Sequence, residues 1–377
     1  MHAMDNSNPF FVSGYHSPSN FCDREKEADD LCEALRNGRN VTLISPRRMG
    51  KTGLMQHVLH QIKALNPKAN TFYLDIFSTQ NRRDLVQMLA TTVLGHLDTA
   101  PQKALQRIGK FIKSIRPVLS VDAFTGSPKV SVDVAPEQEE ASLKEIFDYL
   151  RSSEQPCYIA IDEFQQLAEY PEKGTEALLR THIQSLSQVH FIFAGSKQHL
   201  IQEMFLSAKR PFYQSTQLMS LDVIERTIYY RFAAGFFQKI KCPLSEEVFF
   251  YLYDLFEGHT WYMQVLLNRL YTYRKAPSLR LVDVAVQEIV QESAYPYERL
   301  LSAYNAGHIA LLKALAREGC VKEIYAGHFI ARHRLKTASS VNTALKKLID
   351  KELICASPQG YKVYDRFMDI WLRQQSF

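Results

Sequence analysis

The stretch at residues 45–52, Ser-Pro-Arg-Arg-Met-Gly-Lys-Thr, constrains the fold of this chain more than any other. It follows the apolar run Val41–Ile44 and precedes a helical pattern at residues 54–59. Strand, loop and helix in this order are the context that a phosphate-binding loop requires. Gly50 lets the backbone approach phosphate oxygens closely, and the backbone N–H groups and the positive end of the helix then face the anion. Ser45 stands where the usual pattern has its first glycine, whereas the Gly-Lys-Thr core is intact.

A second motif favours this interpretation over a chance Gly-Lys-Thr in a loop. Residues 157–163, Cys-Tyr-Ile-Ala-Ile-Asp-Glu, are an apolar run that ends in two carboxylates, as expected of a buried parallel strand. Ligands of open α/β sheets lie beyond the carboxyl ends of the strands. We therefore expect Asp162 and Glu163 beside the phosphate loop, at the end of a strand that neighbours strand 40–44. The alternative is a solvated strand end without a role.

The chemistry expected of each residue follows from its type. Lys51 is expected to reach the β- and γ-phosphates, the hydroxyl of Thr52 to ligate Mg²⁺, and Asp162 to hold the same ion through water. Glu163 is placed to orient or deprotonate the attacking water, which points to hydrolysis rather than to binding alone. Ser196 ends another apolar run, and it either senses the γ-phosphate or caps the helix that follows.

The chain has 377 residues, which is enough for two or three domains. No apolar run approaches the roughly 18 residues of a membrane span, and the first residues lack the apolar core of a signal peptide. The six cysteines are dispersed without a Cys-x-x-Cys pair, which indicates a reduced compartment. We therefore expect a cytoplasmic protein without a membrane span or metal clusters.

The pattern along the chain changes twice. Strands alternate with helices through about residue 220, which predicts a parallel sheet with helices on both faces. Within this region, apolar and polar residues alternate on both sides of a Gly-containing turn at residues 117–136. This pattern predicts an inserted hairpin, which is either a partner-binding arm or surface decoration. Residues 221–304 are helical only and predict a small helical domain. Residues 305–377 predict three helices and a two-stranded wing, the pattern of a winged helix-turn-helix.

The elements expected from these patterns have the following bounds. The strands of the sheet lie at residues 40–44, 71–77, 157–163, 189–196 and 216–221. The helices lie at residues 21–35, 84–97, 141–150, 175–187, 197–206, 222–237, 245–256, 260–273, 282–295, 308–317, 324–333 and 339–351.

These features together resemble the archaeal-type ATPase family, a branch of the P-loop ATPases close to the signal-transduction ATPases (STAND) and to AAA+ proteins. The blocks that carry the resemblance lie at residues 8–10, 21–27, 46–54, 161–165, 194–196, 210–213 and 258–264. The paired arginines before Gly-Lys-Thr are the most specific of them. The resemblance implies an α/β fold with an AAA+-like P-loop NTPase parallel sheet, followed by a helical lid and a winged helix-turn-helix. It also implies ATP with Mg²⁺, and ATP hydrolase activity.

The predicted site combines residues of the motifs with residues that the resemblance places near the adenine. The catalytic residues are expected to be Glu163, Lys51, Ser196 and Arg48. The nucleotide is expected to contact Ser45, Pro46, Arg47, Arg48, Met49, Gly50, Lys51, Thr52 and Gly53, and the resemblance places Phe21 and Arg24 near the adenine. The metal ligands are expected to be Thr52 and Asp162. At least one of the paired arginines is expected near the nucleotide; the alternative is a pair with an acidic residue of the core.

Two departures from the family pattern leave roles open. Relatives carry an arginine shortly after Pro-Leu-Tyr, whereas residues 211–215 read Pro-Phe-Tyr-Gln-Ser. A finger arginine is therefore missing there, and Arg210 is either a substitute or a solvated loop charge. Thr260 stands where relatives usually have proline, so the resemblance assigns it no role. Without a finger arginine the argument for a ring is weak, and the oligomeric state stays open.

The C-terminal segment carries the basic excess of the chain. Residues 305–377 contain 12 Lys and Arg against 6 Asp and Glu, so the rest of the chain has a net charge of −1 within a total of +5. The basic residues around the third helix are Arg332, Arg334, Lys336, Lys346, Lys347 and Lys351. They either contact DNA phosphates or solvate a protein-interaction module. Two functions follow: an ATPase switch that moves the lid and winged helix, or a DNA-binding or protein-interaction regulator with slow or vestigial hydrolysis.

Overall fold

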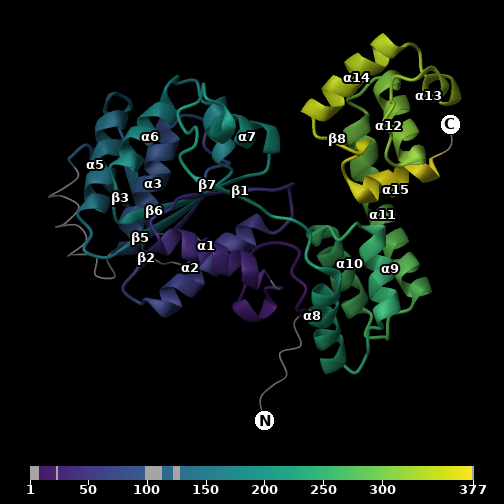
Figure 1. Cartoon of the computed structure of the whole chain (residues 1–377), viewed down its shortest axis with the longest axis horizontal. Coiled ribbons are helices and arrows are strands. Elements are labelled where there is room, and N and C mark those ends of the chain that lie inside the picture. The colour runs from purple at the N-terminus through teal and green to yellow at the C-terminus, as the bar shows by residue number, and fades with distance from the viewer. Residues whose placement is uncertain (1–7, 23, 98–112, 122–127, 376–377) are drawn as a thin grey trace. The chain divides into compact units, whose positions relative to one another are not determined.

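The computed structural model describes residues 8–22, 24–97, 113–121 and 128–375 (Figure 1). These residues belong to two compact units. Residues 11–232 and 259–261 form the first, here called the sheet unit. The described parts of Met1–Phe10, Ala233–Gly258 and Tyr262–Phe377 form the second, here called the helical unit. The domain boundaries expected at residues 220 and 304 stay predictions.

The sheet unit is built on five parallel strands in the order β2-β5-β6-β1-β7. They are β1 (Val41–Ile44), β2 (Asn70–Asp75), β5 (Cys157–Asp162), β6 (Val189–Gly195) and β7 (Gln217–Ser220). The predicted parallel sheet is therefore confirmed. One expectation is wrong: β5 does not neighbour β1, because β6 pairs with both and stands between them.

Helices cover both faces of this sheet (Figure 1). One face holds α1 (Glu25–Arg36) and α2 (Lys51–Leu65), and the other holds α3 (Arg82–Leu97), α5 (Glu139–Arg151), α6 (Thr175–Gln184) and α7 (Gln198–Leu206). Side chains of a strand alternate between faces. In β5, Ile159 and Ile161 join the apolar cluster of the α3 face, whereas Tyr158 and Ala160 join that of the α2 face. Burial on both sides explains why this strand is a continuous apolar run.

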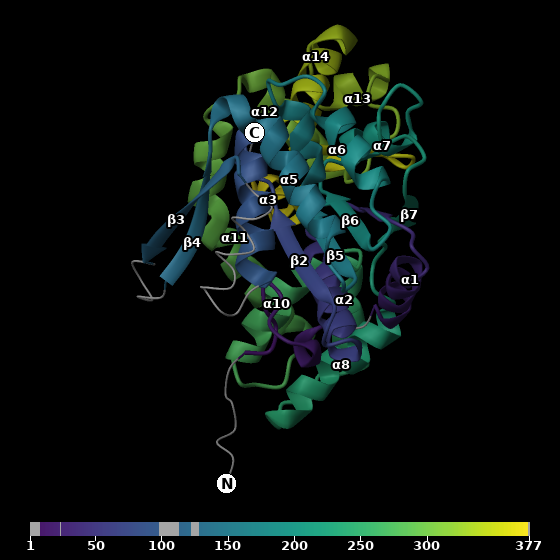
Figure 2. The same ribbon diagram turned by 90° about the vertical axis from the view of Figure 1, so that its left-hand side faces the viewer.

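The predicted hairpin is present as β3 (Ile115–Val121) and β4 (Pro128–Val134), which pair antiparallel. Its predicted turn lies outside the described residues. Figure 2 shows the hairpin beside the helices of the α3 face. Arg83 of α3 forms an ion pair of 2.9 Å with Asp133 of β4. Three short 3-10 helices complete this unit: η1 (Pro18–Asn20), η2 (Pro136–Gln138) and η3 (Phe164–Glu169).

The C-terminal part of the chain is helical apart from one small hairpin. Its elements are α8 (Arg226–Lys239), α9 (Glu246–Leu255), α10 (Thr260–Thr272), α11 (Leu279–Leu301), α12 (Ala306–Glu318), α13 (Gly327–Arg332), α14 (Ala338–Asp350), β8 (Ile354–Ser357), β9 (Gly360–Val363) and α15 (Arg366–Gln374). The predicted helices and wing are all found. Helix α11 extends beyond the expected segment at both ends and contains Pro296. Helix α15 was not predicted, although Asp365 caps it by accepting hydrogen bonds from the backbone N–H groups of Phe367 and Met368.

The described residues bear on a possible membrane span and on the state of the cysteines. Among them, no helix combines the length and the apolarity that crossing a membrane requires. All six cysteines are free thiols.

Gly195, the last residue of β6, allows a specific test of the packing. A Cβ atom at this position would lie 2.0 Å from Gln165 Oε1 and 2.5 Å from Ile201 Cγ1. We expect Gly195→Ala to lower the free energy of unfolding by about 1–3 kcal/mol, as overpacking does, in urea denaturation. The matched control is Gly95→Ala in α3, where a Cβ meets nothing within 4 Å. Alanine favours a helix by about 1 kcal/mol over glycine, so this variant should not lose stability. An equal loss in both variants would contradict the packing argument.

Candidate functional site

The loop between β1 and α2 encloses the ammonium group of Lys51. Gly50 has a φ of 92° and precedes the first residue of α2, a conformation that a side chain would strain. Lys51 is 5% exposed. Its Nζ donates hydrogen bonds to the carbonyl oxygens of Ser45 at 3.1 Å and Pro46 at 2.9 Å, and to Ser45 Oγ at 3.2 Å. The serine that replaces the usual glycine therefore contributes an acceptor to the loop.

The protonation of Lys51 depends on this enclosure. Burial lowers its pKa to about 8, although the nearby carboxylates of Asp162 and Glu163 favour the charged form. Arg47 adds to the lowering as a like charge. A group buried with too little negative charge around it gains from an anionic ligand. The loop is thus suited to receive phosphate.

The end of β5 meets the start of α2 through Asp162. Thr52 Oγ1 donates a hydrogen bond of 2.5 Å to Asp162 Oδ2, and the hydroxyl of Tyr73 in β2 donates another of 3.1 Å to the same oxygen. The backbone N–H of Glu163 donates to Oδ1 at 3.0 Å. Asp162 is 3% exposed, and burial raises its pKa in spite of these donors. Hydroxyl and carboxylate lie together although a strand separates β1 from β5, because α2 crosses the sheet face above β6, β5 and β2.

This donor set fits a magnesium ion. Mg²⁺ prefers oxygen ligands and is usually held by one or two carboxylates together with substrate phosphates. Thr52 and Asp162 offer a hydroxyl and a carboxylate at one place. Within the described ranges, no group of three or more His, Cys, Asp or Glu side chains forms an all-protein metal site, and Mg²⁺ does not require one.

Glu163 follows Asp162 in a strained backbone conformation. Its φ is 55°, in the left-handed region that few residues other than glycine adopt. Its Oε2 accepts hydrogen bonds from Ser196 Oγ at 2.7 Å and from Gln165 Nε2 at 2.5 Å. The alternative that Ser196 caps the following helix is wrong, because the N-cap of α7 is Lys197, without a side-chain capping bond. Ser196 instead lies at the carboxyl end of β6, bonded to Glu163.

The paired arginines of the loop lie in different surroundings. Arg48 has a φ of 62°, and its guanidinium lies 4.1 Å from the ring centroid of Trp261. The alternative expected from the sequence was an ion pair with an acidic residue of the core. The observed partner of Arg48 is instead the aromatic ring of Trp261. Arg47 is half-buried. The carbonyl oxygen of Met49 accepts a hydrogen bond of 3.5 Å from Thr260 Oγ1, so Thr260 contacts the loop although proline is usual there.

The segment before β1 also reaches the loop. Phe21 stacks on His57 of α2 with 4.4 Å between the ring centroids, and its ring edge would lie 3.2 Å from a Cβ at Gly53. Arg24 is 3% exposed, with a φ of 77°. Its guanidinium donates to Glu27 at 2.7 Å, to the Met49 carbonyl at 3.2 Å and to the Asp222 carbonyl at 2.6 Å. Arg24 thereby fixes the loop, and the base contacts expected of Phe21 and Arg24 stay predictions.

The structure decides against one of the two alternatives for Arg210, because its side chain is not a solvated loop charge. It forms ion pairs with Glu176 of α6 and with Glu203 of α7, the latter at 3.4 Å, and its side chain is 26% exposed. A half-buried, doubly paired arginine is a packing element between two helices. A solvated charge would lack these partners, whereas the role of a substitute finger arginine stays a prediction.

Three residues at this site could not be identified from the sequence. Tyr73 lies opposite Ala160 in the pairing of β2 with β5, a register that the sequence does not reveal. Gln165 is buried, with 3% of its surface exposed. The ring of Trp261 makes the cation–π contact with Arg48. The one signal in the sequence is the position of Gln165, two residues after Glu163, its hydrogen-bond partner. This signal is weak, because polar residues are common at the ends of strands.

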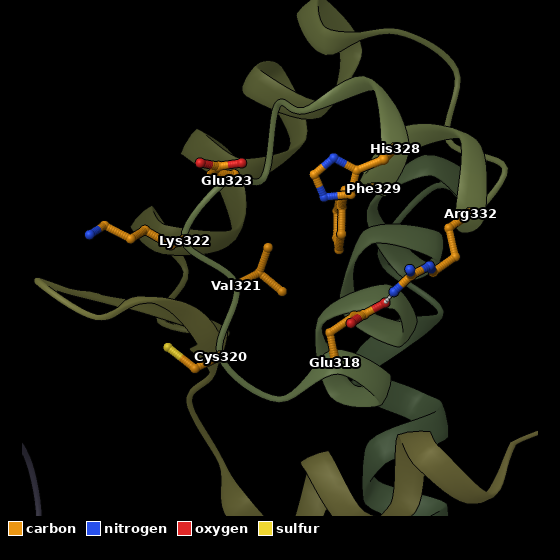
Figure 3. A pocket seen from close by; sticks show the side chains of 8 residues that line it. All are labelled: Glu318, Cys320, Val321, Lys322, Glu323, His328, Phe329 and Arg332. Carbon is orange, nitrogen blue, oxygen red and sulfur yellow. Dashed lines mark hydrogen bonds and ion pairs between the residues drawn. The ribbon is translucent and has the colours of Figure 1, made fainter.

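A hollow of about 200 Å³ lies in the winged helix domain between the end of α12 and α13. Figure 3 shows Glu318 bonded to Arg332 there, while Lys322 extends away from the other side chains. The pair is 2.9 Å long, and the same carboxylate accepts from His333. Because Glu318 and Arg332 pair with each other and Lys322 extends away, these three charged groups do not converge on a ligand.

Solved structures share the fold of this chain. A Walker-type ATPase of Pyrococcus abyssi has a TM-score of 0.66 at 18% identity, over 97% of this chain and 99% of that one. The ORC2 protein of Aeropyrum pernix, solved as ADPNP–ADP complexes, has a TM-score of 0.61 at 16% identity, over 98% and 96%. The ORC1 protein of Aeropyrum pernix, solved in complex with DNA, has a TM-score of 0.55 at 13% identity, over 97% and 95%.

A family model covers only the C-terminal part. Residues 295–374 match the family described as "Probable winged helix domain". No curated protein matches the chain. At these identities the likeness concerns the fold, and at that level the predicted resemblance and fold class are confirmed. The chain therefore has the AAA+-type P-loop fold found in archaeal Walker-type ATPases and ORC proteins, with a winged helix domain at its C-terminal end.

Proposed function

We propose that this chain binds ATP with Mg²⁺ and hydrolyses it, and that the nucleotide cycle drives a movement of the helical lid and the winged helix. The observation that carries the proposal is the hydrogen bond of 2.5 Å between Thr52 Oγ1 and Asp162 Oδ2, with Glu163 next in sequence. It supports a metal–triphosphate site because hydroxyl, carboxylate and lysine lie at one edge of the sheet. The ADPNP–ADP complexes of the structurally similar ORC2 protein lend further support.

Each residue has a separate task in this proposal. Lys51, which now donates to the carbonyl oxygens of Ser45 and Pro46, would donate to phosphate oxygens instead when the nucleotide is bound. The backbone N–H groups at the start of α2 face the phosphates. Thr52 and Asp162 hold the metal ion, which supplies positive charge to the developing negative charge when bound. Glu163 accepts a proton from the attacking water, and Ser196 holds Glu163. Arg48 is proposed to approach the γ-phosphate from the loop.

The winged helix supports a second candidate function, binding to DNA. Arg334, Lys336 and Lys346 are exposed, and among the described residues none of them has an acidic partner. By contrast, Arg332 pairs with Glu318 at 2.9 Å and Lys351 with Asp350 at 3.2 Å. Unpaired cations around helix α14 suit contacts to phosphates. The ORC1 protein with the same fold was solved in complex with DNA. The cytoplasmic location stays a prediction.

Paired variants of the site separate binding from hydrolysis. Lys51→Ala should abolish ATP binding in calorimetry while the Tm stays within a few degrees, because burying the ammonium is itself unfavourable. Glu163→Gln should keep ATP affinity and lower the kcat for phosphate release by about 10²–10⁴-fold. Glu169→Gln, which removes an exposed carboxylate that pairs with Lys197, is the control and should retain both. Negligible phosphate release by the wild type and by Glu163→Gln alike would remove the hydrolase proposal.

The pKa of Lys51 predicts proton uptake on binding. In the free protein burial lowers this pKa to about 8, and an approaching phosphate raises it again. Above about pH 8 the free lysine loses its proton, so ATP binding should take up a proton and weaken as the pH rises. Calorimetry in buffers of different ionisation enthalpy measures this uptake. Lys51→Arg keeps its charge throughout and should lose the pH dependence. Equal affinity at about pH 7 and pH 9.5 in the wild type would contradict the assignment.

Salt dependence tests the DNA-binding candidate. We expect the combined variant Arg334→Gln, Lys336→Gln, Lys346→Gln to reduce the slope of log K against log salt by up to about three, since each phosphate that is no longer neutralised lowers the slope by about 0.9. The control variant Arg332→Gln, Lys351→Gln removes charges that are already paired, so its slope should change less. Wild-type affinity for duplex DNA that does not vary between roughly 50 and 200 mM salt would exclude phosphate contacts.

A further inference from the structure

Gln165 lies two residues after Glu163, in the first turn of η3, and its side chain is enclosed. It is 3% exposed. Its amide occupies the space between the carboxylate of Glu163 and the backbone of Gly195. A buried amide at this place requires a reason, because burial of polar groups is unfavourable unless hydrogen bonds replace those to water.

The orientation of this amide follows from the charge of its neighbour. Gln165 Nε2 lies 2.5 Å from Glu163 Oε2. An ionised carboxylate only accepts hydrogen bonds, so the NH₂ group must face it. The opposite orientation would bring two oxygens together at this distance. Gln165 Oε1 consequently points away, and it is a buried acceptor without a hydrogen-bond partner among the described residues.

Gly195 makes this arrangement possible. A Cβ at that position would lie 2.0 Å from Gln165 Oε1, so the amide oxygen fills the space that a side chain would take. The next residue, Ser196, donates its own hydrogen bond of 2.7 Å to the same Oε2 of Glu163. Two donors, one from η3 and one after β6, thus converge on one carboxylate oxygen.

We infer that Gln165 is a positioning residue for hydrolysis, which together with Ser196 fixes Glu163 through Oε2 and leaves Oε1 to receive the proton of the attacking water. The inference rests on the proposed function. In the step it serves, a water proton moves to Oε1, the water oxygen bonds to the γ-phosphorus, and the bond from that phosphorus to the leaving ADP oxygen breaks. The left-handed backbone of Glu163 aims the side chain, and the two donors prevent its rotation.

Steady-state kinetics distinguish this role from simple packing. Gln165→Leu removes the donor and keeps most of the volume, so kcat should fall about 100-fold while KM for Mg-ATP changes less than about twofold. The matched control is Gln166→Leu in the same 3-10 helix, because Gln166 donates to the Thr79 carbonyl at 3.1 Å and does not contact Glu163. Its kcat should remain near that of the wild type.

A charged replacement adds a readout that packing alone would not change. Gln165→Glu sets a second carboxyl against Glu163, and two such groups share a proton and raise the pKa of the pair. The acidic limb of the kcat–pH profile should therefore move to higher pH. At neutral pH the variant should also have a lower Tm, and adding Glu163→Gln should restore most of that loss, since the new amide can donate to the new carboxylate.

The possible outcomes separate the two proposals. Suppose that the wild type hydrolyses ATP, that Gln165→Leu has a normal kcat and that the pH profile of Gln165→Glu does not move. These results would overturn the positioning role and leave the proposed hydrolysis standing. Tm effects that simply add in the double variant would also overturn it, because they would show that residues 163 and 165 do not interact. Absent turnover in the wild type would remove the proposed hydrolysis and, with it, the role of Gln165.

Discussion

The hydrogen bond from Thr52 to Asp162 joins the two halves of the candidate site, and the remaining geometry depends on it. The two residues are 110 positions apart, on α2 and on β5, with β6 between the strands that lead to them. The bond exists because α2 crosses the sheet above β5 and because Asp162 ends its strand level with the sheet edge. Lys51 precedes Thr52 and Glu163 follows Asp162, so this single contact places both neighbours. A shift of β5 by one residue would turn Asp162 to the other face of the sheet.

Burial acts on both of the enclosed charged groups of the candidate site. Lys51 and Asp162 are 5% and 3% exposed, and burial moves each pKa towards the neutral form, down for the lysine and up for the aspartate. Buried charges are costly unless they are paired. In the proposed function, a metal ion near Asp162 and a polyphosphate near Lys51 would stabilise the charged forms of both groups together. Burial of these two groups is thus the feature that would favour binding of a metal-bound polyphosphate in the proposed function.

Local patterns predicted much of this structure, and contacts between distant segments account for what they missed. Gly50, Lys51 and Thr52 are recognisable because loop, charge and helix start lie within a few residues. The apolar run of β5 identified a buried strand, because burial on both faces leaves no polar position. The order of strands was not readable, so β5 was wrongly placed next to β1. Tyr73 and Gln165 were missed because pairing register and the enclosed space at Gly195 are properties of the folded sheet.

The backbone around the site restricts which residues can replace those now present. Arg24, Arg48 and Glu163 all have a φ between 55° and 77°, a region that β-branched side chains avoid. Glycine would relieve each backbone and delete each side chain, so substitutions that stabilise the fold here remove a group that the site uses. Attempts to make this protein more heat-resistant should therefore leave these three positions alone and look to surface helices. Among natural variants, the same restriction favours asparagine, aspartate or glycine over valine, isoleucine and threonine at these places.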